Sequence, residues 1–405
     1  MRVEEREIGI EQVAVGMYIC RLDRAWIDTP FPLQGFLVNS DAQITLLRRY
    51  CSRVWIDVER GRIAPDAPLG TLNALPRAVE ALLGSTEHTD TTTLDEEIPV
   101  AREMLDNVSR LIAKIIDDLR AGQILSAQDV EAAAAPIVKS VLRNADALFL
   151  VNAMRKRDAY GYSHAINCGA LAAAFGRNLG LPEELLVELA SGGLLLDVGK
   201  SRLPAGLLAH IGLYDAGQMQ QARRHVELSL QILADGDQQS AIVHDMVRSH
   251  HERCDGSGYP DGLQGTLIPL FGRLAAIIDS FDAMTSDRTY ASAMPRHEAL
   301  QAIYRGRGLL YHAELVEQFI NCLGIYPTGS LVELSNGEVA IVMAQNPARR
   351  LRPRVMLLTD ADKRLRGRFE SLDLMLQPDV DSARVEIVRP LPTGAHGLDP
   401  SELYL

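Results

Sequence analysis

The spacing of apolar and polar residues divides the chain into regions with different secondary structure. In residues 1–62 apolar and polar positions alternate, as in strands with one buried face. Strands are predicted at VAVGMYICRLD, GFLVN and SRVWIDV. Between the last two, SDAQITLLRRYC predicts an amphipathic helix, with Ser40 and Gln43 as a capping box. Residues 1–62 are therefore predicted to form a small α+β module.

Helical periodicity replaces this alternation further along the chain. Residues 63–95 mix Pro, Gly, Ser, Thr and acidic residues, so we expect a linker, with one short helix at RAVEALL. From residue 96 to 324 apolar residues recur every three or four positions, which is the period of a helix. We therefore predict a helical domain, with helices that include VAREMLDNVSRLIAKIIDDLRAG, HAINCGALAAAFGRNLG and LPEELLVELASGGLLLDVGK.

After residue 324 the period shortens again. The stretch GSLVELSNGEVAIVMAQN predicts two short strands joined at Asn336-Gly337, a strong hairpin signal, and PRVMLLTD predicts a third strand. The remaining tail to residue 405 is polar and rich in proline, and we expect it to wrap or fray. The chain is thus predicted to be multidomain and mainly α, a helical bundle with a small α+β N-terminal module and a small β-rich extension over 325–405.

Composition restricts the classes of partner and the cellular compartment. The 405 residues carry a formal net charge of −12, which argues against bulk binding to DNA, RNA or an anionic membrane. No stretch approaches the roughly 20 apolar residues that span a bilayer, and the charged start MRVEEREIGIEQ has no signal-peptide core. The five cysteines form no CxxC pair, so we expect a protein of the reducing cytoplasm.

Candidate chemistry gathers between residues 164 and 251 of the helical region, where six of the ten histidines lie. These histidines and three nearby aspartates are His164, His210, His225, His244, His250, His251, Asp197, Asp255 and Asp279. Burial of an ionisable side chain is costly unless the side chain is paired or bound to metal. Imidazoles and carboxylates on converging helices build dinuclear metal centres, and this donor set suits iron, manganese or zinc more than calcium.

A glycine-rich loop, ERCDGSGYPDGLQG, follows the tandem His250-His251. Glycines let the backbone approach a ligand closely, and two metals can activate water and clamp the oxygens of a phosphodiester. Lys200, Arg253 and Arg288 would offer positive charge to phosphates. Each feature also has an ordinary structural interpretation. A single histidine is often a hydrogen-bonded core residue, and an aspartate and a lysine at a helix end can be a terminus feature.

The loop HHERCDGSGYPDGLQG resembles the signature of HD-GYP domains, which are bacterial metal-dependent phosphodiesterases acting on cyclic di-GMP. The resemblance extends over about 140–324 and includes YSHAINCGALA, LLLDVGK, RRHVE and IIDSFDAMTSDRTY in the family's order. Residues 1–62 also resemble an uncharacterised module often fused ahead of such domains. The strands after 324 resemble the usual continuation of that architecture.

The resemblance implies a set of site residues. The implied metal ligands are His164, Asp197, His225, His250, His251 and Asp279. The implied catalytic residues are Asp197 and Lys200, and the implied substrate contacts are Lys200, Arg253, Asp255, Gly258, Tyr259, Pro260 and Arg288. Asp197 is the expected bridging ligand, shared between a group with His164 and Asp279 and a group with the three later histidines. One or two iron or manganese ions are the implied cofactor.

The sequence departs from the family pattern at three positions. The family's His-Asp dipeptide is Leu196-Asp197, and leucine has no donor atom, so the first ligand group retains three of four members. Ala291 stands where the family usually has a basic residue, and Tyr160 offers no carboxylate for a third metal. Three replacements for the missing imidazole can be considered. The pair His244-Asp245 is too far along its helix, by roughly 9 Å, which leaves His210 and water.

Two functional hypotheses follow from this pattern. The chain is either a weakened or mononuclear phosphodiesterase that converts cyclic di-GMP to the linear dinucleotide or GMP, or an inactive domain. As an inactive domain it would sense cyclic di-GMP or bind a diguanylate cyclase or another signalling protein. The N-terminal module is expected to be regulatory or to form a homodimer.

Overall fold

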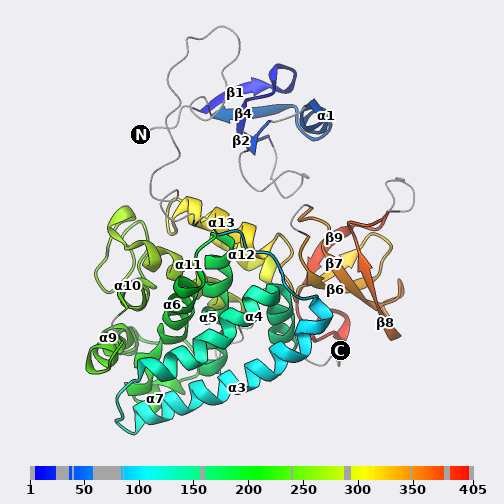
Figure 1. Ribbon diagram of the computed structural model, residues 1–405. Coiled ribbons are helices and arrows are strands. Elements are labelled where there is room, and N and C mark those ends of the chain that lie inside the picture. The colour runs from blue at the N-terminus through cyan, green and yellow to red at the C-terminus, as the bar shows by residue number, and fades with distance from the viewer. Residues whose placement is uncertain are drawn as a thin grey trace. The chain divides into compact units, whose positions relative to one another are not determined.

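The computed structural model divides the chain into two compact units, Met1–Ala81 and Leu82–Leu405 (Figure 1). The structure describes residues 5–23, 36–38, 41–57, 84, 86–155, 160–238, 240–286, 293–346, 349–377 and 384–400. Outside these ranges lie Ser40, the helix predicted at RAVEALL, and both Arg288 and Ala291. In the described part of the chain, no helix is long and apolar enough to cross a lipid bilayer.

Within its described residues, the first unit is a four-stranded antiparallel sheet with one helix. The elements are β1 (Glu5–Gly9), β2 (Tyr18–Leu22), β3 (Phe36–Leu37), α1 (Asp41–Tyr50) and β4 (Arg53–Asp57), and the strand order is β1-β4-β2-β3. Ile19, Leu47 and Val54 are fully buried between sheet and helix. The predicted helix and three strands are confirmed. Strand β1 was not predicted, because EREIG is largely polar and lies at the edge of the sheet.

The second unit begins with helices, which account for most of its described residues. The α-helices are α3 (Leu94–Arg120), α4 (Ala127–Met154), α5 (Tyr160–Asn178), α6 (Glu183–Leu195), α7 (Ala205–Leu208), α8 (Ala216–Arg223), α9 (His225–Asp235), α10 (Ala241–Ser249), α11 (Leu270–Thr285), α12 (Arg296–Arg305) and α13 (Ala313–Leu323). Helix α3 starts at a capping box in which Thr93 and Glu96 satisfy each other's backbone N–H groups. The long amphipathic helices were predicted, whereas the short helices α7, α8 and α12 were not.

Two glycines near the end of α6 and just beyond it bring the candidate ligands together. A Cβ on Gly193 would lie 2.5 Å from the carbonyl oxygen of Cys168 on α5. A Cβ on Gly199, in the 3₁₀ helix η3 (Val198–Arg202), would lie 2.1 Å from the carbonyl oxygen of His225. Only glycine permits backbones to approach so closely. Asp197, between the two glycines, is thereby held against helices α5 and α9.

A five-stranded antiparallel sheet completes the described part of the second unit (Figure 1). Its strands are β5 (Leu331–Leu334), β6 (Val339–Ala344), β7 (Arg354–Thr359), β8 (Leu365–Asp373) and β9 (Ile387–Leu391), in the order β8-β7-β6-β5-β9. The hairpin at Asn336-Gly337 and the third strand are confirmed. The tail does not fray over its described residues, because it contains β8 and β9, which lie at opposite edges of the sheet. Both are partly exposed edge strands, and β9 includes Pro390, which edge positions tolerate.

The sheet and the helices share one hydrophobic core. Ala147 and Leu150 of α4 form a buried cluster with Leu331, Ile341 and Leu358 of the sheet. Beside this cluster Asp146 of α4 accepts hydrogen bonds from the Thr328 hydroxyl at 2.5 Å and from the Gln345 N–H at 2.9 Å. Burial raises the pKa of Asp146 to about 6, although both hydrogen bonds oppose the shift.

The substitution Asp146→Asn is expected to stabilise the second unit at neutral pH. The amide can accept from Gln345 N–H and donate to Thr328 Oγ1, so it keeps both contacts without a buried charge. Because the wild-type carboxyl has a raised pKa, its ionisation destabilises the fold as the pH rises from about 4 to about 6, and the cost is constant above that range. At about 1.4 kcal/mol per pKa unit, a shift of this size costs about 3 kcal/mol.

Thermal midpoints at pH 7.5 and pH 4.5 check this expectation. The midpoint of Asp146→Asn should exceed that of the wild type at pH 7.5, and the difference should shrink at pH 4.5. Asp362→Asn, which changes an exposed carboxylate paired with Arg364, is the matched control and should show no such pH-dependent difference. Equal differences at both pH values would contradict the assigned pKa.

Candidate metal centre

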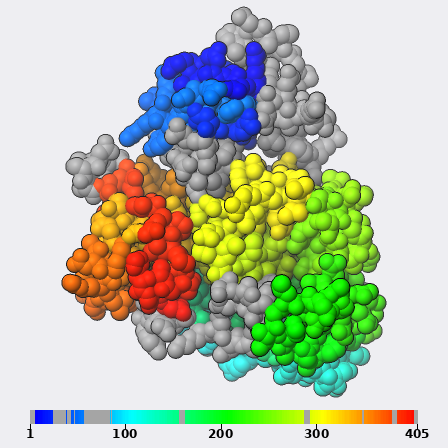
Figure 2. Space-filling model, turned by 180° about the vertical axis from the view of Figure 1, so that it is seen from behind, coloured from blue at the N-terminus to red at the C-terminus, as the bar shows by residue number. Residues whose placement is uncertain are grey.

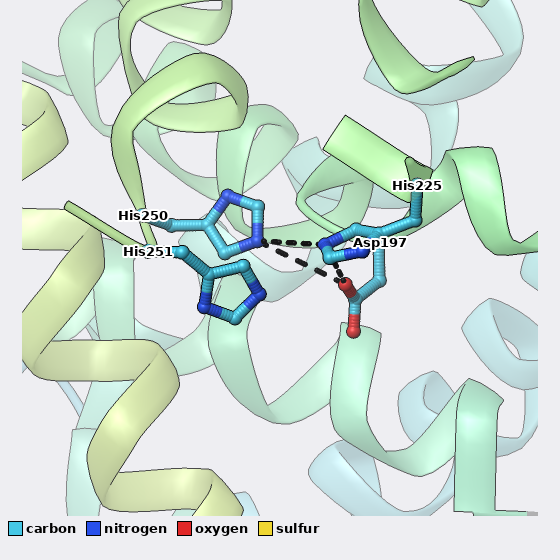
Figure 3. A group of neighbouring side chains, drawn as sticks. All are labelled: Asp197, His225, His250 and His251. Atoms are coloured by element: carbon cyan, nitrogen blue, oxygen red, sulfur yellow. Dashed lines mark hydrogen bonds and ion pairs between the residues drawn. The ribbon is translucent and has the colours of Figure 1, made fainter. Parts of the chain in front are cut away.

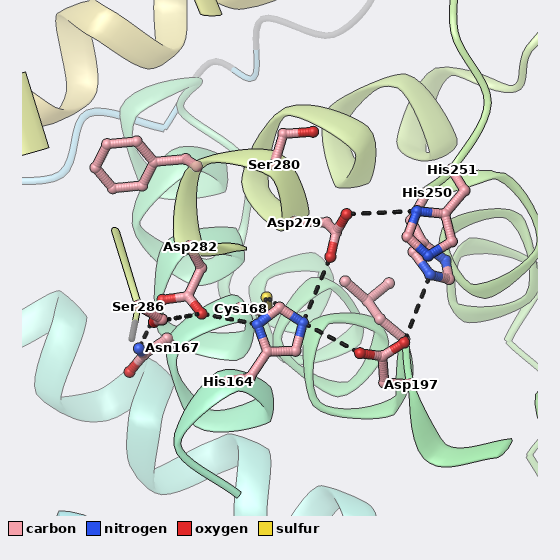
Figure 4. A network of polar contacts seen from close by, with 12 residues as sticks. His164, Asn167, Cys168, Asp197, His250, His251, Asp279, Ser280, Asp282 and Ser286 are labelled. Carbon is pink, nitrogen blue, oxygen red and sulfur yellow. Dashed lines mark hydrogen bonds and ion pairs between the residues drawn. The ribbon is translucent and has the colours of Figure 1, made fainter. Parts of the chain in front are cut away.

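The six predicted ligand residues come from five separate segments of the helical region and converge in space (Figures 3 and 4). His164 lies on α5, Asp197 directly follows Leu196 at the end of α6, and His225 is the first residue of α9. His250 and His251 follow α10, and Asp279 lies on α11. The structure therefore places side chains that are up to 115 positions apart in the sequence around one centre.

Four of these residues form a compact cluster (Figure 3). Each of Asp197, His225, His250 and His251 offers one ligand atom, and these atoms all lie within 4.8 Å of one another. Nε2 of His225 lies 3.2 Å from Oδ1 of Asp197 and 3.4 Å from Nε2 of His250. Nε2 of His250 lies 3.9 Å from the same carboxylate oxygen. The arrangement can hold one metal ion.

The hydrogen bonds of the two imidazoles show why a cation fits this cluster. Nδ1 of His225 donates to the carbonyl oxygen of Ala222 at 2.8 Å, and Nδ1 of His250 donates to that of Val247 at 2.9 Å. Each Nε2 is then left with a lone pair. Both lone pairs face Oδ1 of Asp197, which is buried and accepts no hydrogen bond from the described residues. Three acceptors in contact without a donor need a cation between them.

The protonation state of the histidines agrees with a role as metal ligands. Burial lowers the pKa of His225 to about 4, despite the opposing attraction of Asp197. Burial also lowers the pKa of His250, and it lowers that of His251 well below its usual value. The three imidazoles are therefore neutral at physiological pH, which is the form that binds metal.

The second predicted ligand group surrounds His164. Its Nε2 atom lies 3.3 Å from Oδ2 of Asp197 and 3.4 Å from Oδ1 of Asp279. The other oxygen of Asp279 lies 3.6 Å from Nδ1 of His251, so this carboxylate joins the two groups. Leu196 is 1% exposed and contributes only carbon atoms. The structure thus brings together the three donors that the sequence retains.

Two residues beside His164 were missed by the sequence analysis. Asp282 lies 2.7 Å from Nδ1 of His164, and the sulfur of Cys168 lies 3.7 Å from the same nitrogen. All three side chains are buried and form a second cluster that could hold a metal ion. Burial raises the pKa of Cys168 to about 12, so its thiol stays protonated. A sequence signal existed, because Asp282 is three residues beyond Asp279 and Cys168 four beyond His164, on the same helix faces.

A buried carboxylate, Glu252, holds the glycine-rich loop in place. Glu252 is 1% exposed. Its carboxylate accepts hydrogen bonds from the backbone N–H groups of Asp261 at 2.7 Å, Gly262 at 3.1 Å and Leu263 at 3.0 Å. The sequence analysis did not identify this role. Glu252 follows the tandem histidines directly, so it couples the loop to two of the candidate ligands.

Glu252→Gln should loosen this loop. The amide retains one acceptor oxygen and replaces the other with a donor, so at least one N–H loses its charged partner, at about 2 kcal/mol. We expect about 30-fold faster hydrogen exchange of the amides at residues 261–263. Glu227→Gln, on the exposed side of α9, is the control. Unchanged exchange in Glu252→Gln would show that the carboxylate does not hold the loop.

The predicted substrate-binding residues occupy different kinds of position. The ammonium of Lys200 contacts Oδ2 of Asp197. The ring of Tyr259 stacks on His251, with centroids 4.5 Å apart, and the guanidinium of Arg223 lies 4.6 Å from the Tyr259 ring. Arg223 is exposed and was not identified from the sequence. This stack extends from a candidate metal ligand to a surface cation.

Arg253 and Asp255 make internal contacts in the loop. Arg253 donates to the carbonyl oxygens of His250 at 3.1 Å and Glu252 at 2.8 Å, and to the Ser280 hydroxyl at 3.1 Å. Asp255 accepts from the backbone and side chain of Ser257. Gly258 and Pro260 flank Tyr259 in the same loop. Phosphate binding by Arg253 therefore stays a prediction, since its guanidinium already supports the backbone here.

The suggested replacements for the missing imidazole lie apart from the described cluster. His210 stacks on Tyr214, with ring centroids 5.6 Å apart. His244 has Nε2 3.4 Å from the carbonyl oxygen of Gln238. Neither residue belongs to the groups of possible ligands found in the described ranges.

Three known domain families match the chain. Residues 5–132 match a domain of unknown function, residues 144–315 match the HD domain, and residues 331–385 match a KOW domain associated with the HD domain. A relative named cyclic di-GMP phosphodiesterase PA4108, from Pseudomonas aeruginosa, is 33% identical over 359 residues, which cover 88% of this chain and 86% of the relative. The chain belongs to the HD-GYP family.

Other relatives match over less than half of this chain. A cyclic di-GMP phosphodiesterase of Thermotoga maritima is 34% identical over 40% of this chain, and the response regulator RpfG of Xanthomonas campestris is 33% identical over 42%. The chain spans less than half the length of these two proteins, 45% and 46%. The solved structure of Bd1817 from Bdellovibrio bacteriovorus has a TM-score of 0.47 at 14% identity, over 78% of this chain and 98% of that one.

Proposed function

We propose that this HD-GYP chain is a metal-dependent phosphodiesterase of cyclic di-GMP whose activity is weakened by Leu196. The observation that carries the proposal is the cluster of Asp197, His225, His250 and His251, which has a complete donor set and an unsatisfied carboxylate oxygen. The substrate is inferred from the relative PA4108, which matches over nearly the whole chain.

The side chains around the cluster suit this reaction. A divalent cation, iron or manganese in view of the mixed nitrogen and oxygen donors, would supply an activated water and Lewis acidity. Asp197 orients the ammonium of Lys200, which can neutralise charge on a phosphodiester oxygen. Asp279 and His164, together with Asp197, would supply the three-donor side of the site, where Leu196 provides none. Loss of one ligand should weaken metal occupancy there.

Turnover of cyclic di-GMP with added Mn²⁺ or Fe²⁺ tests the proposal. Chromatography would resolve the linear dinucleotide and GMP, and the metal-free protein and the His250→Ala variant would serve as blanks. We expect slow, metal-dependent product formation by the wild type and none by His250→Ala. Equal product formation by the two proteins would reject the assignment.

Arg223→Ala should weaken substrate binding more than turnover. Its exposed guanidinium lies against Tyr259, at the outer end of the stack that includes His251, and there it can pair with a phosphate. We expect KM for cyclic di-GMP to rise about 10-fold, with kcat changed less than about 3-fold. Arg224→Ala, the exposed neighbouring arginine, is the control and should leave both constants unchanged. A fall in kcat alone would exclude this role.

The absence of a donor atom at Leu196 favours a second function. The chain would then be an inactive domain that senses cyclic di-GMP or binds a signalling protein such as a diguanylate cyclase. Calorimetry distinguishes the two functions. Saturable heat of cyclic di-GMP binding without product in the Mn²⁺-loaded protein would support the sensor. Product formation blocked in His250→Ala would support the enzyme.

A further inference from the structure

We propose that Asp282 is a positioning residue, which holds the imidazole of His164 in the orientation required at the metal centre. This inference rests on the metal-binding part of the proposed function. Asp282 was absent from the ligand set implied by the sequence, and it lies on the side of His164 opposite to Asp197 and Asp279 (Figure 4). Its role is to act through His164, not to bind metal itself.

The hydrogen bond between the two side chains sets the direction of the ring. Oδ2 of Asp282 lies 2.7 Å from Nδ1 of His164, and both residues are buried. A carboxylate is an acceptor, so Nδ1 carries the hydrogen. Nε2 is thereby directed at Asp197 and Asp279, 3.3 and 3.4 Å away. A carboxylate behind a histidine in this manner fixes the tautomer and raises its strength as a ligand.

Two asparagine amides and a serine hydroxyl hold Asp282 in turn. The Nδ2 group of Asn167 donates to Oδ1 of Asp282 at 2.6 Å, and the Ser286 hydroxyl donates to Oδ2 at 3.3 Å. Asn152 donates its own Nδ2 group to Oδ1 of Asn167 at 2.6 Å, which settles how the Asn167 amide is turned. The carboxylate therefore has donors on both oxygens, and α4, α5 and α11 all contribute to its orientation.

Because Leu196 supplies no metal ligand, the support of His164 by Asp282 matters more at this metal position. A metal position with four protein donors tolerates some movement of one of them. Here only His164, Asp197 and Asp279 remain at that position, so a turn of the His164 ring would leave two. Asn167 and Ser286 hold Asp282, and Asp282 keeps the ring from turning, because any rotation would leave buried polar atoms without partners.

Mn²⁺ binding to the metal-free full chain, measured by chelator competition, tests the role without any substrate. Asp282→Asn keeps the volume of the side chain but puts an N–H donor opposite Asn167 Nδ2 or His164 Nδ1, each of which donates to the carboxylate in the wild type. We expect the dissociation constant of the weaker Mn²⁺ site to rise 10- to 100-fold. Ser286→Ala, which removes the longest contact to the same oxygen, should change it less than about 3-fold.

A double-mutant cycle with His164→Gln separates positioning from general support of the fold. In the His164→Gln background Asp282→Asn should have no further effect on Mn²⁺ affinity. An equal loss in both backgrounds, or unchanged affinity in Asp282→Asn alone, would overturn the proposal. If Asp282→Asn does not fold, Asn167→Ala takes its place, with a smaller loss in the same direction and the same dependence on His164. Absence of cyclic di-GMP hydrolysis in the wild type would not affect this readout.

Discussion

Asp197→Ala should reduce the metal content of the purified protein to background and lower metal-dependent hydrolysis of cyclic di-GMP more than about 100-fold. The two oxygens of this carboxylate serve different neighbours. Oδ1 faces His225 and His250, whereas Oδ2 faces His164 and Lys200. No other described side chain contacts both ligand groups and the lysine. Its loss therefore removes a donor from each metal position and the partner of a cation.

Metal analysis by mass spectrometry and a turnover assay check this result in parallel. Asp235→Ala is the matched control, since Asp235 pairs with Arg202 at the surface of the same region and is more than half exposed. The control should retain metal and activity. Retention of both by Asp197→Ala would mean that the four-residue cluster is not the metal site.

Leu196→His should give the chain an additional metal equivalent and at least about 10-fold higher turnover. The position is buried and directly precedes Asp197, so an imidazole there would complete the group that now has three donors. Burial of a neutral imidazole here destabilises the fold when no metal ion is bound and stabilises it when the imidazole coordinates one. The thermal midpoint of the variant should therefore rise with Mn²⁺ concentration more steeply than that of the wild type.

Leu196→Met is the control for the change of shape, because it keeps an apolar side chain of similar volume and gives no imidazole. It should match the wild type in metal content and turnover. If Leu196→His folds and gains neither metal nor activity, the absence of an imidazole at this position does not limit metal binding or turnover. The sensor would then be the better description of the chain.

The fold class could be predicted from the sequence because most elements have one apolar face. The long helices and the central strands of both sheets carry that pattern. The strands that were missed, β1, β8 and β9, are all at sheet edges. Such strands bury little, and their pairing is decided by backbone hydrogen bonds that leave no trace in apolar spacing. Helix α8 was missed for a related reason, because it buries none of its residues.

The site residues that lie in sequence motifs could be predicted, whereas those whose role depends on tertiary packing could not. His164, Asp197 and the three later histidines could be identified because they sit in recognisable stretches of sequence. Asp282 and His164 are 118 positions apart, so their contact depends on how α5 and α11 pack. Glu252 and Arg223 were missed because charged residues are common in loops and at helix ends, where most are merely solvated.

The core shared by α4 and the C-terminal sheet affects how this protein can be divided for experiments. The family match to the HD domain ends at residue 315, before the first strand of that sheet. A fragment cut there would uncover Ala147 and Leu150 and remove both partners of Asp146. The end of the HD domain match is therefore not a boundary of independent folding. An isolated fragment of residues 144–315 would be a poor substitute for the full chain, because newly exposed apolar surface favours aggregation.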